Sequence, residues 1–151
     1  MTHWTERWRV LLAVFVILKR ADGQILLLRR AGTGYMDGKL GLPSGHVDGN
    51  EPADVALSRE AREEVGVEVG PADLRLVHTM HRRAEEGEFE YIDMFFEAKT
   101  WQGDPENKEP HKCSELVWVD PSQLPEDMVP GVGAALEQIT RGEPYSSRNF
   151  S

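Results

Sequence analysis

The order of the expected elements predicts an α+β domain in which a mixed β-sheet lies between helices. Apolar runs typical of strands occur both before and after a stretch with helical periodicity, and a second helical pattern follows them. The expected strands are residues 9–19, 24–30, 40–43, 74–82, 89–98 and 115–119, and the expected helices are residues 52–65 and 129–141.

The first strand and the first helix have the clearest local signals. Residues 10–18 form the longest apolar run and are rich in β-branched side chains, which suits a buried strand. The Asp-Gly pair that follows favours the positive φ of a tight hairpin. In residues 52–65 an apolar residue recurs every fourth position, at Ala53, Leu57, Ala61 and Val65, and the flanking proline and glycine suit the two helix ends.

A chain of 151 residues is long enough for a single domain with a proper core, and we treat residues 1–151 as one domain. We expect its core to span about residues 9–141 and residues 142–151 to form a flexible tail. Near the start of the chain, Trp4 and Trp8 are expected to pack on the edge of the domain.

Composition excludes several classes of partner. A net charge of -9 argues against general affinity for nucleic acid or for anionic membranes, since both partners need a basic surface. Residues 10–18 are too few to span a bilayer, and no targeting segment is apparent. Cys113 is the only cysteine, so it has no partner for an internal disulfide. We therefore expect a cytoplasmic protein.

Three glutamates on the first expected helix suggest a metal site. Glu60, Glu63 and Glu64 stand at i, i+3 and i+4, so a helix would project them from one face. Like charges this close repel, and the repulsion grows in a dry pocket. A divalent cation relieves that repulsion, and Mg²⁺ commonly bridges such carboxylates to substrate phosphates. The pattern thus points to a metal-dependent site for a phosphorylated substrate.

The same stretch resembles the Nudix box, G-x5-E-x7-R-E-U-x-E-E-x-G-U, in which U is a bulky apolar residue. Val67 fills the last apolar position, and Ala61 is a small occupant of the other one. The fixed positions are all filled, by Gly45, Glu51, Arg59, Glu60, Glu63, Glu64 and Gly66. This spacing is far more specific than a glutamate pair on a helix.

The resemblance implies an α/β/α sandwich that cleaves a phosphoanhydride in a nucleoside diphosphate linked to another group. Carried over by position, Glu60, Glu63 and Glu64 would bind Mg²⁺, or Mn²⁺ in its place. Ser44 stands where the family commonly has glycine, and its backbone C=O would still supply a metal ligand. Arg59 would orient the carboxylates, and Glu51 would position the loop and the start of the helix.

Further candidates lie outside the helix. Arg30 lies as far ahead of the box as a phosphate-binding arginine of the MutT-like branch, and Glu109 resembles a loop glutamate that completes the metal site or acts as base there. Lys39 is a second candidate for the phosphates, Tyr35 for gating the substrate, and His46 for a position near the phosphates. His78, Met80 and Tyr91 would either line a base pocket or belong to the core.

Taken together, these features predict a Mg²⁺-dependent hydrolase that converts a nucleoside or deoxynucleoside triphosphate to a monophosphate and pyrophosphate. The small-molecule nucleotide would be its partner, and the protein would be a monomer or a homodimer. The alternatives are a pyrophosphatase acting on ADP-ribose, nucleotide sugars or dinucleotides, and a non-catalytic Nudix module that only binds nucleotides.

Overall fold

The computed structural model describes residues 3 and 6–151, so the expectation for Trp4 lies outside the described part of the chain. Trp8 is 66% exposed and does not pack on the domain edge as expected. Each predicted strand and helix has a counterpart. The strands are β1 (Leu11–Leu18), β2 (Ile25–Arg30), β3 (Leu40–Gly41), β4 (Ser44–His46), β5 (Arg75–Arg83), β6 (Glu90–Ala98), β7 (Cys113–Val119) and β8 (Tyr145–Arg148). The helices are α1 (Ala53–Val65), the short 3-10 helix η2 (Pro71–Asp73) and α2 (Pro130–Thr140).

These strands form two sheets. The larger sheet has the order β4-β1-β6-β5-β8 and is mixed, because β1 and β6 run parallel, as do β5 and β8, while the other pairs are antiparallel. The smaller sheet, β3-β2-β7, is entirely antiparallel. The predicted mixed sheet is therefore present, but three of the predicted strands belong to a separate sheet.

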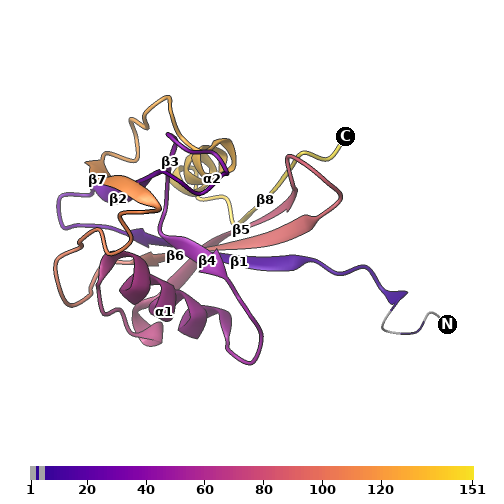
Figure 1. Ribbon diagram of the computed structural model, residues 1–151, viewed down its shortest axis with the longest axis horizontal. Coiled ribbons are helices and arrows are strands. Elements are labelled where there is room, and N and C mark those ends of the chain that lie inside the picture. The colour runs from indigo at the N-terminus through magenta and orange to yellow at the C-terminus, as the bar shows by residue number, and fades with distance from the viewer. Residues whose placement is uncertain (1–2, 4–5) are drawn as a thin grey trace.

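The two helices cover opposite sides of the strands, as Figure 1 shows. Each helix buries an apolar face against its own half of the core. The half under α1 includes Val14, Val16, Phe96, Leu57, Ala61 and Val65. The half under α2 includes Ile17, Met80, Phe95, Val132 and Leu136. The fold is thus the expected α/β/α sandwich. In residues 3 and 6–151 no helix is long and apolar enough to cross a membrane.

Both ends of α1 match the sequence signals. Pro52 is the N-cap residue, with extended backbone, so the helix proper begins at Ala53. Gly66 ends the helix in the left-handed conformation, with φ 71°, and its N–H bonds to the carbonyl of Arg62. This left-handed conformation favours glycine, and a Cβ at Gly66 would also meet Cε of the flexible Lys108 side chain at 2.7 Å.

The predicted flexible tail is wrong, because residues 145–148 form strand β8 at the edge of the larger sheet. The buried ring of His78 lies between β5 and this segment. Its Nδ1 is 2.7 Å from the carbonyl oxygen of Glu143, and its Nε2 is 2.7 Å from Oγ of Ser146. These contacts and the parallel pairing with β5 hold a segment that is too polar to show a hydrophobic pattern.

Residues 44–46, which follow the expected strand of residues 40–43 and were not predicted to be a strand, form β4. Ser44, Gly45 and His46 pair antiparallel with Phe15, Val14 and Ala13 of β1. Ser44 is therefore held in the larger sheet. This pairing brings the backbone of β4 beside α1, where the box glutamates are.

Candidate active site

The box glutamates lie on the side of α1 that faces β4. The Ser44 N–H donates to Oε2 of Glu64 at 3.1 Å. An ideal Cβ on Gly45 would lie 2.3 Å from Cδ of Glu60, so the Glu60 carboxylate occupies the space above this glycine. Glu63 is one turn further out, with half of its side chain exposed. Two carboxylates are thus pressed against a strand, and the third faces solvent.

Arg59 connects these carboxylates to the start of the box. Its guanidinium donates to Glu51 at 2.7 and 3.3 Å, to Glu60 at 3.0 Å and to Glu63 at 3.4 Å. The bonds with Glu51 are the main reason why the pKa of Arg59 is raised. A single cation therefore balances part of the carboxylate charge, and Glu51 holds that cation in place.

Burial and mutual repulsion shift the protonation of the inner glutamates. Burial raises the pKa of Glu64 to about 8, against a smaller lowering by the Ser44 N–H and a further rise from Glu60 and Glu109. Burial also raises the pKa of Glu60, although Arg59 opposes this effect. Such shifts are typical of sites that are completed by a cation or that exchange protons.

Glu109 lies close enough to the helix glutamates for its charge to raise the pKa of both Glu60 and Glu64. Its side chain is 28% exposed, and one carboxylate oxygen is 3.9 Å from Nζ of Lys112. Glu109 is 45 or more positions away from Glu60 and Glu64 in the sequence. The connection between β6 and β7 brings it into the same cluster.

Arg30 also faces this cluster, since its charge lowers the pKa of Glu64. It lies at the end of β2, where Nε donates to the Tyr35 carbonyl at 2.8 Å and a terminal nitrogen donates to Oγ1 of Thr33 at 3.2 Å. Its guanidinium lies 5.4 Å from the centroid of the Tyr35 ring, which is 45% exposed. The loop of residues 31–39 thus holds the Arg30 side chain through two bonds.

The interactions that the structure describes for Lys39 and His46 are with groups other than the helix glutamates. Lys39 is exposed, and its charge lowers the pKa of Asp127. The His46 ring centroid is 5.8 Å from that of Tyr91. These interactions involve groups other than the glutamates, in contrast to the electrostatic effects of Arg30 and Glu109 on Glu64.

His78 and Met80, each 1% exposed, belong to the interior. The sequence analysis did not identify Asp93, which is also 1% exposed and accepts a bond from Nε of Arg82. Burial raises the pKa of Asp93, and Arg82 opposes that effect. The sequence does contain a signal for Asp93, because an aspartate inside an otherwise apolar strand pattern indicates a buried charged group.

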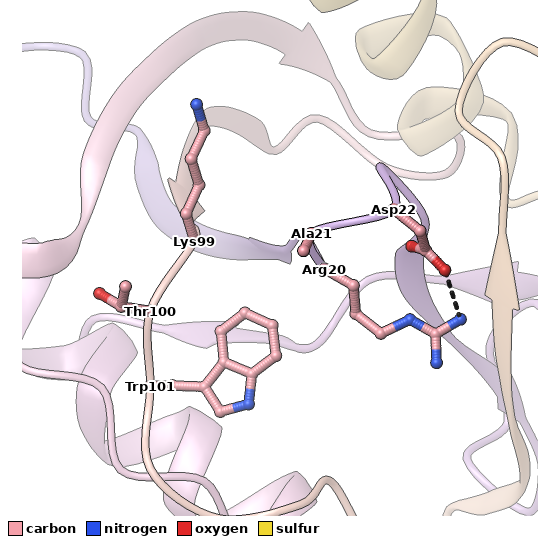
Figure 2. A pocket seen from close by; sticks show the side chains of 6 residues that line it. All are labelled: Arg20, Ala21, Asp22, Lys99, Thr100 and Trp101. Atoms are coloured by element: carbon pink, nitrogen blue, oxygen red, sulfur yellow. Dashed lines mark ion pairs between the residues drawn. The ribbon is translucent and has the colours of Figure 1, made fainter.

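Two hollows in the described part of the chain lie away from the glutamate cluster. One, of about 680 Å³, is lined by Arg20, Asp22, Lys99 and Trp101 among others; Figure 2 shows the ion pair between Arg20 and Asp22 on one side of it. Another, of about 790 Å³, reaches Glu51 and Arg59 from the outer side of α1. Neither is lined by Glu60, Glu63 or Glu64.

The fold and this carboxylate cluster define a class of hydrolase. The NUDIX domain model matches residues 10–139, and the chain belongs to the Nudix family. It is accordingly a hydrolase that acts on phosphorus-containing anhydrides, of the MutT-like kind.

Particular relatives agree with this assignment. The 8-oxo-dGTP diphosphatase of Haemophilus influenzae is 31% identical over 125 residues, which cover 80% of this chain and 83% of that protein. The enzyme of the same name from Escherichia coli is 29% identical over 116 residues, covering 72% and 83%. The crystal structure of a MutT NUDIX hydrolase from Burkholderia pseudomallei superposes with a TM-score of 0.77 at 27% identity, covering 87% of this chain and 98% of that one.

We expect Gly45→Ala to lower turnover by about tenfold or more, because the new methyl group would displace the Glu60 carboxylate. The fold should survive, since a flexible side chain can move aside. Steady-state kinetics and thermal melting measure the two effects. Gly70→Ala is the matched control, because its Cβ would meet only Oδ2 of Asp73 at 3.4 Å. Full activity in Gly45→Ala would show that the position of Glu60 is unimportant.

Proposed function

We propose that this protein is a Mg²⁺-dependent hydrolase that converts a nucleoside or deoxynucleoside triphosphate to a monophosphate and pyrophosphate. The observation that carries the proposal is the convergence of Arg30 and Glu109 with the box glutamates Glu60 and Glu64. Relatives named as 8-oxo-dGTP diphosphatases support a triphosphate, including a damaged one, as the substrate class.

Nudix hydrolases generally use a divalent metal. In residues 3 and 6–151 no three His, Cys, Asp or Glu side chains already lie close enough to hold an ion. The donor types nevertheless fit Mg²⁺, which prefers carboxylate and carbonyl oxygens. Burial, together with the charges of Glu60 and Glu109, raises the pKa of Glu64, and a bound cation would stabilise its charged form. We propose Glu60, Glu63, Glu64 and the Ser44 carbonyl as its ligands, with Mn²⁺ as a substitute.

When bound there, the metal supplies Lewis-acid stabilisation of the phosphate charge and lowers the pKa of the attacking water. The other roles belong to the chain itself. Arg30 would hold a phosphate through its guanidinium, which suits bidentate contact. Glu109 would accept a proton from the attacking water. The oxygen of that water would bond to phosphorus while the P–O bond of the anhydride breaks. Arg59 would keep the glutamates oriented. Tyr35 would cover the substrate, and Lys39 and His46 are the weaker candidates for phosphate contacts.

The test is a panel of nucleotides assayed with Mg²⁺, with phosphate and pyrophosphate release measured separately. The panel contains canonical and 8-oxo triphosphates, ADP-ribose, a nucleotide sugar and a diadenosine polyphosphate. We expect pyrophosphate and a monophosphate from the triphosphates. Turnover confined to ADP-ribose, sugars or dinucleotides would overturn the proposed substrate class. No turnover, with a nucleotide still raising the melting temperature, would point to a binding module instead.

A further inference from the structure

The loop that leads to Glu109 is bonded to the end of α1. The Lys108 N–H donates to the carbonyl of Glu64 at 3.1 Å, and the Glu106 N–H donates to the carbonyl of Val65 at 2.9 Å. Both acceptors are at the C-terminal end of the helix, where carbonyls have no partner within the helix. The backbone just before Glu109 is therefore fixed to the element that carries the other glutamates.

The backbone just after Glu109 is fixed to a different element. The Ala31 N–H donates to the carbonyl of Lys112 at 2.9 Å. Gly32, with φ 64°, lies so close to this loop that a Cβ there would be 2.6 Å from the carbonyl oxygen of His111. The downstream half of the loop is thus held against the loop that carries Tyr35 and holds Arg30.

Asn107 joins these two halves through one side chain. Its Oδ1 accepts from the Glu109 N–H at 3.1 Å, and its Nδ2 donates to the carbonyl of Cys113 at 2.7 Å. Cys113 in turn donates its N–H to the carbonyl of Glu109 at 3.0 Å. A carboxamide is suited to this task, because it carries a donor and an acceptor on one carbon.

The carboxylate of Glu109 does not fix its own position. Its ion pair with Lys112 is long, at 3.9 Å, and exposed, and such pairs contribute little. The nearby Glu60 and Glu64 are acidic as well, so they offer the Glu109 carboxylate no opposite charge to hold it. The position of the carboxylate therefore depends on how firmly the backbone of Glu109 is held.

We propose that Asn107 is a positioning residue that fixes the backbone of Glu109 and thereby holds its carboxylate in the active site. The inference rests on the proposed function, since it matters for turnover only if Glu109 takes part in the reaction. Asn107 itself would not contact the substrate. Its effect would pass entirely through the carboxylate of Glu109.

A double-mutant cycle tests this dependence. We would measure kcat and KM for the best triphosphate with Mg²⁺ in the wild type, Asn107→Ala, Glu109→Gln and the double variant. We expect Asn107→Ala to lower kcat by about tenfold with little change in KM, as is typical when a supporting contact of a site is lost. In the Glu109→Gln background the same change should have almost no further effect on kcat.

Amide hydrogen exchange supplies a second readout that needs neither metal nor substrate. Because the Glu109 N–H donates to Asn107, its exchange should quicken in Asn107→Ala. Asn149→Ala is the matched control, since Asn149 also donates from its side chain to a backbone carbonyl, that of Arg83, but far from the glutamates. It should leave both kcat and the exchange of Glu109 unchanged.

The possible outcomes distinguish the positioning role of Asn107 from the proposed hydrolase function. An equal loss of kcat from Asn107→Ala in both backgrounds would mean a general effect on folding and would overturn the positioning role. Wild-type activity in Glu109→Gln would also overturn it while leaving the hydrolase intact. No triphosphate turnover in the wild type would refute the proposed function itself. If Asn107→Ala does not fold, Asn107→Asp replaces it in the cycle, because it keeps an acceptor for the Glu109 N–H while the donor to Cys113 is replaced by a negatively charged oxygen.

Discussion

Glu63→Gln is expected to lower kcat by about 10³-fold or more, which corresponds to a loss of about 4 kcal/mol or more of transition-state stabilisation. The substitution replaces a charged oxygen donor by a neutral amide of nearly the same size. Glu63 is half exposed and its ion pair with Arg59 is 3.4 Å long, so it contributes less than about 1 kcal/mol to stability. We therefore expect the melting temperature without metal to stay close to that of the wild type.

The measurement is pyrophosphate release at saturating triphosphate across a Mg²⁺ series, together with thermal melting with and without Mg²⁺. Glu137→Gln on α2 is the matched control, because this glutamate is exposed on the other side of the molecule. It should retain both the activity and the rise in melting temperature with metal. A variant at position 63 with wild-type kcat and metal response would show that Glu63 is not a ligand.

Glu64→Gln should stabilise the metal-free protein at high pH but not at low pH. Burial raises the pKa of Glu64 from 4.5 to about 8 in the folded protein, so between these values the folded state holds a proton that the unfolded state releases. The free energy of unfolding therefore falls as the pH rises through this window and levels off above it. The pKa difference corresponds to about 3–5 kcal/mol. Glutamine mimics the protonated form at every pH and avoids this loss.

Urea unfolding in the presence of a chelator, at pH 5 and at pH 8.5, measures the effect. The gain from Glu64→Gln should be small at pH 5 and amount to a few kcal/mol at pH 8.5. Mg²⁺ should then stabilise the wild type more than the variant at pH 8.5. Glu68→Gln is the control, since the Glu68 side chain is 61% exposed. An equal gain at both pH values would mean that the pKa of Glu64 is not raised.

Local patterns predicted most of the fold. The helix of residues 53–65 follows from a four-residue apolar repeat and from the proline and glycine at its ends, all of which act within one or two turns. The same reasoning missed β8, because a Tyr-Ser-Ser-Arg segment owes its conformation to β5 and to the buried ring of His78. It also did not separate the two sheets, because strand order depends on long-range pairing.

Local sequence patterns likewise predict part of the candidate site but not all of it. The spacing of the helix glutamates is a local property, and the structure places them on one side of α1 as expected. The approach of Arg30 and Glu109 was inferred from a resemblance, because no local pattern connects residues so far apart. Asn107 was missed because its importance lies in two backbone groups that come together only in the folded loop.

Strand β8 also affects how the chain avoids aggregation. It pairs with residues 79–82 of β5, a nine-residue strand, and so covers part of an edge whose N–H and C=O groups would otherwise be unpaired. A long open edge of this kind invites pairing with another chain. The edge that the molecule presents instead has four residues, with serines at its centre and an arginine at its end. We expect a shortened protein ending at Arg141 to lose this cover and to aggregate more readily than the full chain.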